Sequence, residues 1–96
     1  MDERIPCVYI LASKRNGTLY VGVTSGLARR VHEHKTGTVD GFSNQYGTHI
    51  LVYYEVCPSM ESAIQREKQL KAGSRKRKVN LIESMNPEWH DLTDQT

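Results

Sequence analysis

Alternating and β-branched positions predict a β-hairpin near the N-terminus. Residues Cys7 to Ala12 and Thr18 to Val23 are rich in types that favour strands, and Asn16-Gly17 lies between them. An Asn-Gly pair between two such runs is a strong hairpin signal. If these two residues alone form the turn, opposed residues carry numbers that sum to 33. The pattern therefore predicts two antiparallel strands in that register.

The two faces of this predicted hairpin differ in character, because side chains alternate between faces along a strand. One face is entirely apolar and is expected to belong to the core: Val8, Ile10, Ala12, Leu19, Val21 and Val23. The other face carries Tyr9 and Leu11 from the first strand, and Tyr20 and Gly22 from the second. Two phenols thus share one face beside a residue that has no side chain.

Helical spacing begins after this hairpin. The run from Leu27 to Lys35 contains no Gly or Pro, which predicts a short helix. Arg30 and His34 fall on the same stripe as the apolar Leu27 and Val31. We therefore expect two polar side chains on the inward side of this helix.

A third strand and two further helices are expected in the second half of the chain. Residues 49–57 are rich in β-branched and aromatic types and predict the strand. A helix is expected from Met60 to Ala72, and another between Ser74 and Asn86-Pro87. Glu67 interrupts an otherwise apolar stripe of the first of these helices, which is formed by Met60, Ala63, Ile64 and Leu70.

Length and composition narrow the class of protein. Ninety-six residues suit one domain, expected over residues 1–96 with a short acidic C-terminal tail at 87–96. The formal charge of +2 excludes a chain-wide polycation. The longest apolar runs have five residues, far fewer than a bilayer span requires, and two cysteines do not make a disulfide framework. We therefore expect a cytoplasmic protein with no membrane contact.

Positive charge is concentrated in one stretch. Seven of the thirteen basic residues lie between Arg66 and Lys78, with Glu67 the only acid among them. Such a run is either a solvated helix face or a surface that follows a nucleic-acid backbone. The residues we expect to contact nucleic acid are Arg29, Lys68, Lys71, Arg75, Lys76, Arg77 and Lys78.

The polar residues on inward faces have two interpretations. Tyr9 and Tyr20, each taken alone, are ordinary strand residues that pack. Arg30 and Glu67 are costly to bury unless they form an ion pair or bind something else. A structural Arg30–Glu67 pair is one explanation, and a functional cleft is the other.

The spacing of these residues resembles a known family. Cys7-Val8-Tyr9, ten intervening residues and Tyr20-Val21-Gly22, followed by Arg30, His34 and a helical Glu67, are similar to the GIY-YIG nucleases, specifically their small stand-alone bacterial members. The first triplet has cysteine where glycine is commonest and valine for isoleucine. The resemblance implies an α+β fold with a small three-stranded antiparallel sheet flanked by helices.

The resemblance also implies roles for particular residues. Glu67 would ligate one divalent metal, Mg²⁺ or Mn²⁺. Tyr9 and Tyr20 would act at the attacking water, and either could be the base, since an unperturbed phenol has a pKa of ~10 and needs a nearby positive charge to lose its proton near neutral pH. Arg30 and His34 would serve the phosphate and the proton transfers. Asn86 would match a late asparagine of some members.

The sequence therefore predicts a metal-dependent endonuclease that hydrolyses phosphodiester bonds in DNA. A nucleic-acid-binding module of the same fold, with little or no cleavage alone, is the alternative. In a third hypothesis, a protein-interaction adaptor, Arg30 and Glu67 would form only a structural pair. Single-stranded, duplex and branched DNA, and RNA, all remain open as substrates, because phosphate contacts carry no sequence information.

Overall fold

Three antiparallel strands form the middle layer of the protein. The computed structural model describes residues 4–37 and 46–96. In it, β1 (Cys7–Ala12) lies between β2 (Leu19–Thr24) and β3 (Ile50–Val56). The predicted three-stranded antiparallel sheet is confirmed.

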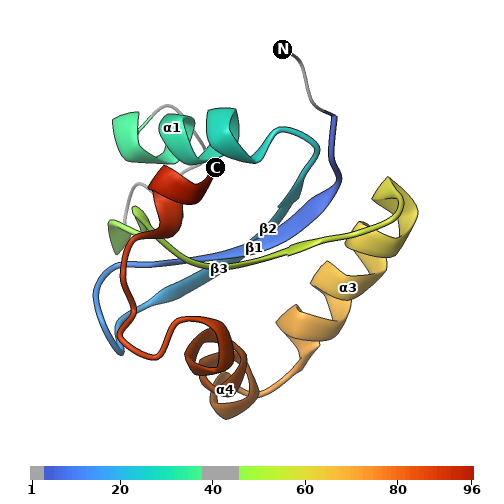
Figure 1. Ribbon diagram of the computed structural model, residues 1–96. Helices are drawn as coiled ribbons and strands as arrows, with labels where there is room; N and C mark the ends of the chain where they lie inside the picture. The colour runs from blue at the N-terminus through green and yellow to red at the C-terminus, as the bar shows by residue number, and fades with distance from the viewer. Residues whose placement is uncertain (1–3, 38–45) are drawn as a thin grey trace.

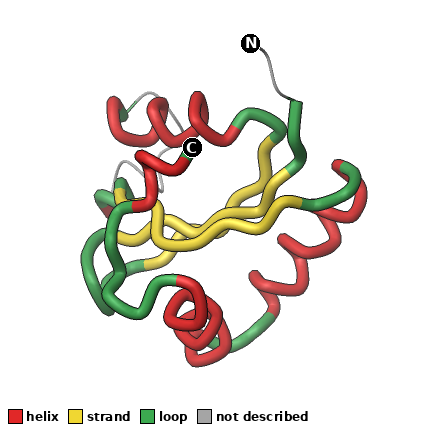
Figure 2. Tube along the Cα trace, viewed as in Figure 1, coloured by secondary structure: helices red, strands yellow, loops and turns green. Residues whose placement is uncertain are grey.

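Helices cover both faces of this sheet. Helix α1 (Leu27–Thr36) and the short 3-10 helix η1 (Leu92–Gln95) lie on one face, and α3 (Met60–Ala72) and α4 (Arg75–Met85) lie on the other (Figures 1 and 2). Ser59 caps α3 and Ser74 caps α4 through their side-chain oxygens. The predicted α+β class is confirmed, and η1 is an element that the sequence pattern did not predict.

The register of the hairpin differs from the prediction by two residues. Tyr9 lies opposite Gly22 and Ala12 opposite Leu19, so opposed numbers sum to 31 rather than 33. The turn is longer than Asn16-Gly17, since the Ser13 N–H bonds the Thr18 carbonyl at 3.0 Å. A shift of two leaves every side chain on its predicted face, because the side-chain period of a strand is two.

Two hydrophobic clusters lie on the two faces of the sheet. The larger cluster joins the apolar hairpin face to α3 and α4, and includes Val8, Ile10, Ala12, Val21, Val52, Ala63, Leu70 and Ile82. The smaller cluster lies under α1 and η1 and consists of Tyr9, Leu11, Val31, Leu51 and Leu92, with Tyr20, Leu27 and Tyr54 packed against it. The phenol-bearing face is therefore buried as well.

The exposure of α3 corrects part of the sequence analysis. Ala63 and Leu70 are buried, but Met60 and Ile64 are 36% and 37% exposed although they were expected on the same apolar stripe. The two buried residues are seven positions apart, which is about two helical turns, so α3 contacts the sheet along one narrow line. Met60 and Ile64 lie beside that line, so the stripe is narrower than its sequence pattern.

The acidic segment 87–96 packs against the body of the molecule. Trp89 and Leu92 are buried. The Asp91 carboxylate accepts a hydrogen bond from the Leu51 N–H at 3.3 Å and from Lys35 Nζ at 2.6 Å. Burial alone would raise the pKa of Asp91, but the hydrogen bond and charge of Lys35 and the Thr93 hydrogen bonds outweigh it and lower that pKa. Asp91 therefore ties the segment to both β3 and α1.

No helix in residues 4–37 and 46–96 is long and apolar enough to cross a bilayer.

Candidate active site

Three rings meet on the face of the sheet that α1 covers. The Tyr9 hydroxyl lies 3.2 Å from Nε2 of His34, and both side chains are almost fully buried. The Tyr20 ring centroid is 5.1 Å from that of His34 and 6.4 Å from that of Tyr9. Strands β1 and β2 contribute the phenols and α1 contributes the imidazole. A phenol hydrogen-bonded to an imidazole can hold a proton and pass it on.

Gly22 makes room for this cluster. It is the residue opposite Tyr9 on β2. A Cβ atom at Gly22 would lie 2.5 Å from both the Cζ and the hydroxyl oxygen of Tyr9, closer than any ordinary contact. The Tyr9 ring therefore lies directly over Gly22. The missing side chain at Gly22, which the sequence pattern indicated, leaves the space that this ring fills.

Arg30 lies one helical turn before His34 on α1 and is less buried than its stripe predicts. Its side chain is 43% exposed, and its Nη1 lies 3.5 Å from Oε1 of Glu33. The anticipated ion pair with Glu67 is not formed by these two described residues, because Glu67 pairs with Lys71 instead. Arg30 therefore keeps an accessible guanidinium near the rings, and the adaptor hypothesis loses the pair on which it depended.

Glu67 lies on α3, which packs against β2 and β1. Its side chain is 17% exposed, and Oε2 lies 3.1 Å from Nζ of Lys71. Within the described residues no three His, Cys, Asp or Glu side chains gather as a metal cage. Magnesium is nevertheless often held by one or two carboxylates, with water and substrate phosphate as its other ligands. A single carboxylate that already holds a cationic ammonium group fits such an ion.

Comparison with known proteins assigns the chain to a family. Residues 5–80 match the model of the GIY-YIG catalytic domain. The chain belongs to the GIY-YIG family. The resemblance seen in the sequence is thus confirmed, and the match gives the chain a nuclease-like fold. Members of this family generally use a divalent metal and act on nucleic acid.

Several curated relatives of this GIY-YIG domain carry the name UPF0213 protein. One from Pseudomonas aeruginosa is 35% identical over 75 residues, covering 78% of this chain and 71% of the relative. One from Staphylococcus haemolyticus is 34% identical over 76 residues, covering 79% and 92%. One from Natronomonas pharaonis is 37% identical over 75 residues, covering 78% and 87%. The relatives are thus small bacterial and archaeal members of the family.

A solved structure agrees with this assignment. The solution NMR structure of a UPF0213 protein from Bacillus halodurans aligns with a TM-score of 0.56 at 28% identity. The alignment covers 96% of this chain and 97% of the other. The fold of this GIY-YIG domain is therefore shared along nearly its whole length.

Asn86 lies away from the ring cluster and bonds to the backbone. Its Nδ2 donates to the carbonyls of Val52 (3.2 Å) and His90 (2.7 Å), and its Oδ1 accepts from the His90 N–H at 3.0 Å. It ends α4 and fixes the turn that follows. The geometry gives Asn86 a structural task, and its catalytic role stays a prediction.

Some basic residues of the 66–78 stretch also hold the fold together. Arg75 donates from Nη2 to the carbonyls of Asn16 (2.9 Å) and Gly17 (2.7 Å), which fixes the β1–β2 loop against the start of α4. Lys78 donates from Nζ to the Gly73 carbonyl at 2.8 Å. These contacts occupy N–H donors that could otherwise bind a phosphate.

Arg66 is committed to a network between α3 and β3. It donates to both carboxylate oxygens of Glu55, and Tyr53 donates its hydroxyl proton to the same carboxylate. Burial, then the hydrogen bond to Glu55 and the charge of Glu55, raise the pKa of Tyr53 to about 12. Burial alone would raise the pKa of Glu55, but Arg66 and Tyr53 outweigh it and lower that pKa. This network holds the sheet to α3.

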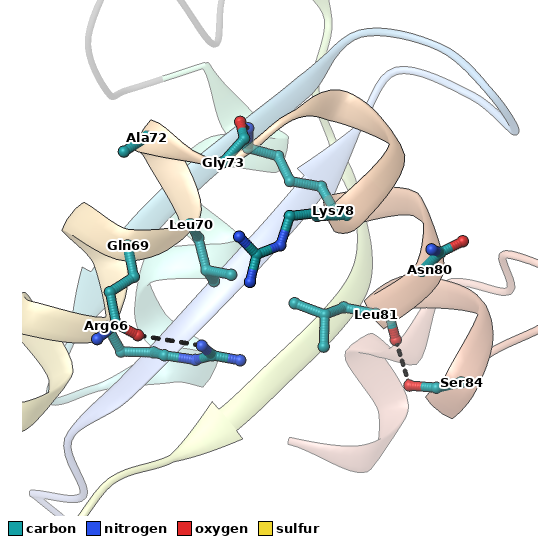
Figure 3. A pocket seen from close by; sticks show the side chains of 10 residues that line it. Arg66, Gln69, Leu70, Ala72, Gly73, Lys78, Asn80, Leu81 and Ser84 are labelled. Atoms are coloured by element: carbon teal, nitrogen blue, oxygen red, sulfur yellow. Dashed lines mark hydrogen bonds between the residues drawn. The ribbon is translucent and has the colours of Figure 1, made fainter.

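A groove of about 510 Å³ separates α3 from α4 beside that network. Figure 3 shows Arg66 and Leu70 on α3 facing Leu81 on α4 across it, with Arg66 directed toward Gln69. Of the three basic residues that line this groove, Arg66 and Lys78 already have partners, and Arg77 has no ion pair within the described residues.

The remaining basic side chains point into solvent. Within the described residues, Lys68, Lys76 and Arg77 make no ion pair or side-chain hydrogen bond. Arg29 is 86% exposed and lies 3.4 Å from Glu33. These four side chains are the most available of those predicted to contact nucleic acid.

Sequence reasoning missed two features of the site. The Glu67–Lys71 and Arg29–Glu33 pairs both follow the four-residue spacing of helical ion pairs, so that rule would have found them. The grouping of Arg4 with Arg29 and Arg30 had no such signal. It depends on where the segment before β1 passes the start of α1.

Proposed function

We propose that this GIY-YIG protein is a divalent-metal-dependent endonuclease that hydrolyses phosphodiester bonds in DNA, with Mg²⁺ or Mn²⁺. The observation that carries the proposal is the Tyr9–His34 hydrogen bond beside Tyr20, over a glycine that admits the Tyr9 ring. A protein that only binds nucleic acid has no chemical need for a buried phenol–imidazole pair at this point of the fold.

Each residue contributes one task to this reaction. Tyr9 and His34 hold the proton that the attacking water gives up, between the phenol oxygen and Nε2. Arg30 presents two parallel donors to the phosphate oxygens, where negative charge builds in the transition state. Glu67 would hold the metal, which supplies an activated water and neutralises the phosphate charge when bound. Tyr20 packs against His34 and orients it.

The proposal places the protein in the cytoplasm. Cys7 and Cys57 are both buried and free rather than joined in a disulfide. A reducing compartment keeps thiols in this state.

The decisive experiment is Glu67→Gln, with cleavage of labelled DNA measured across a Mg²⁺ titration. The amide keeps the volume but loses the charge that a hard cation favours, so cleavage should fall by orders of magnitude while DNA affinity is kept or increased. Glu61→Gln is the matched control, since Glu61 is an acid in the first turn of the same helix.

Three outcomes separate the hypotheses. Loss of cleavage in Glu67→Gln but not in Glu61→Gln supports the metal-dependent nuclease. If wild type and both variants bind DNA and none cuts it, the binding module is the correct interpretation. Wild-type cleavage and unaltered metal dependence in Glu67→Gln would overturn the metal assignment.

A further inference from the structure

A polar pocket lies at the start of α1. It has a volume of about 320 Å³ and is lined by Arg4, Thr24, Ser25, Gly26, Arg29, Arg30 and Glu33. Three guanidinium groups and one carboxylate give these lining residues a charge of +2. The pocket is therefore suited to an anion.

Arg30 connects this pocket to the ring cluster. It lies four residues before His34 on α1, a rise of about 6 Å, and it also lines the pocket. From His34 to Gly26 the helix rises about 12 Å. A strand with a rise of 3.4 Å per nucleotide covers these distances in about two to four nucleotides. An anion in the pocket would therefore lie on the same strand as a phosphate at Arg30.

We propose that this pocket binds a backbone phosphate of the substrate other than the one that is cut. The proposal rests on the proposed function and deepens it, because it makes the substrate a polynucleotide rather than any phosphodiester. Arg4 and Arg29 present the planar forks that match phosphate oxygens. The Thr24 hydroxyl accepts from the Gly26 N–H at 3.0 Å and keeps its own proton to donate.

Glu33 is the carboxylate with which a phosphate in this pocket would compete. Its two carboxylate oxygens lie 3.4 Å from Nε of Arg29 and 3.5 Å from Nη1 of Arg30. The Arg29 side chain is largely exposed and the Arg30 side chain is partly exposed, so these ion pairs are weak. A phosphate bound by Arg29 in the pocket and the phosphate that the proposed function places at Arg30 would therefore both compete with this one carboxylate.

The pocket is better suited to this task than the larger groove between α3 and α4. In that groove Arg66 is bound to Glu55 and Lys78 to the Gly73 carbonyl. In the polar pocket, Arg29 and Arg30 share a single, partly exposed carboxylate. Arg77 also lines the groove, so what distinguishes the pocket is its position on α1 beside Arg30 rather than a greater charge.

The first test measures binding of labelled oligonucleotides without divalent metal, at several salt concentrations. The variant Arg4→Gln/Arg29→Gln should bind more weakly and flatten the slope of log K against log salt by ~0.7–0.9, the loss of one phosphate contact. The variant Lys14→Gln/Arg15→Gln removes the same charge from the exposed β1–β2 loop and should keep the wild-type slope. Glu33→Gln should bind about 1.5- to 5-fold more tightly, because it removes the competing carboxylate.

The second test locates the phosphate. Single neutral methylphosphonate linkages are placed along the cut strand, and cleavage is measured for wild type and for Arg4→Gln/Arg29→Gln. We expect one position, within about four nucleotides of the cut, at which the neutral linkage raises KM for wild type but not for the variant. A structural role of the two arginines would not produce such a position-dependent loss.

The outcomes separate this proposal from the proposed function. If Arg4→Gln/Arg29→Gln changes the salt slope of binding but the wild type does not cleave DNA, the phosphate pocket is supported and the proposed nuclease function is wrong. Three results would overturn the proposed phosphate pocket, whether or not the protein cuts. These are equal salt slopes for the two double variants, no oligonucleotide binding by the wild type, and additive effects at every methylphosphonate position. Thermal melting of every variant checks that the fold is intact.

Discussion

Replacing Gly22 with alanine tests whether the close approach of Tyr9 to β2 organises the site. The new Cβ would lie 2.5 Å from the Cζ atom of Tyr9. Carbon atoms in ordinary contact are ~3.5–4.0 Å apart, so the Tyr9 ring or the strand must move by about 1 Å. The hydroxyl of that ring is bonded to His34, which is itself buried.

That movement should break the hydrogen bond between Tyr9 and His34. The bond is already 3.2 Å long, and a further ~1 Å takes it beyond hydrogen-bonding distance. Overpacking of this kind costs ~1–3 kcal/mol of stability. A displacement of ~1 Å at a reacting group can cost ~10²-fold in rate. We therefore expect Gly22→Ala to be both less stable and strongly impaired in cleavage.

The sign of the stability change makes the assay decisive. Where a strand has space for the new methyl group, replacing glycine with alanine should stabilise the fold by ~0.5–1 kcal/mol. At Gly22 the contact with Tyr9 predicts that the same replacement destabilises the fold. Urea unfolding measures the difference. Gly73→Ala is the matched control, because the atom nearest its new Cβ would be 3.4 Å away, an ordinary contact.

A double-mutant cycle then identifies the cause. In a Tyr9→Ala background the ring is absent, so Gly22→Ala should be neutral or stabilising. If Gly22→Ala destabilises equally in both backgrounds, or leaves wild-type stability and cleavage unchanged, the steric reasoning is refuted.

Arg30→Lys should lose most cleavage with an unchanged melting temperature, because an ammonium cannot give a phosphate two parallel donors; near-wild-type turnover contradicts this. Arg75→Gln should lower stability by ~0.5–1.5 kcal/mol, since it frees the β1–β2 loop, whereas Lys76→Gln should keep stability and flatten the salt slope of DNA binding by ~0.7–0.9. The same response from both would show that Arg75 does not hold the loop. The lowered pKa of Asp91 stabilises the fold above the unfolded value of ~3.9 and ceases to do so as pH falls through the folded value. Asp91→Asn should therefore melt below wild type at pH 7, with a gap that closes below about pH 4; a pH-independent gap would contradict the role of the charge.

The faces of the strands and the family followed from the sequence alone. Alternation placed Tyr9, Tyr20 and Gly22 on one face, and their spacing with Arg30, His34 and Glu67 carried the family resemblance. These inferences hold because side-chain direction in strands and helices is a local property, set by periods of two and 3.6 residues. The same local signals located α3, whose expected and observed limits coincide.

The register of the hairpin and the irregularity in the pairing of β3 were decided only by the tertiary structure. The hairpin register moved by two without changing any face, so no periodicity could detect it. A register shift in the pairing of β1 with β3 places both Val52 and Tyr53 in the larger cluster, although adjacent strand residues normally face opposite ways. No pattern in the sequence marks this irregularity.

The partners of the charged residues depended in part on local spacing and in part on packing. Arg30 and Glu67 were each predicted on an inward stripe, but the nearest opposite charge of each lies on its own helix, at Glu33 and Lys71. Arg75 bonds to a loop almost sixty residues earlier in the chain. Which charges remain available to a substrate is settled by such long-range contacts, because a side chain bonds to whatever the fold brings within about 3 Å of it.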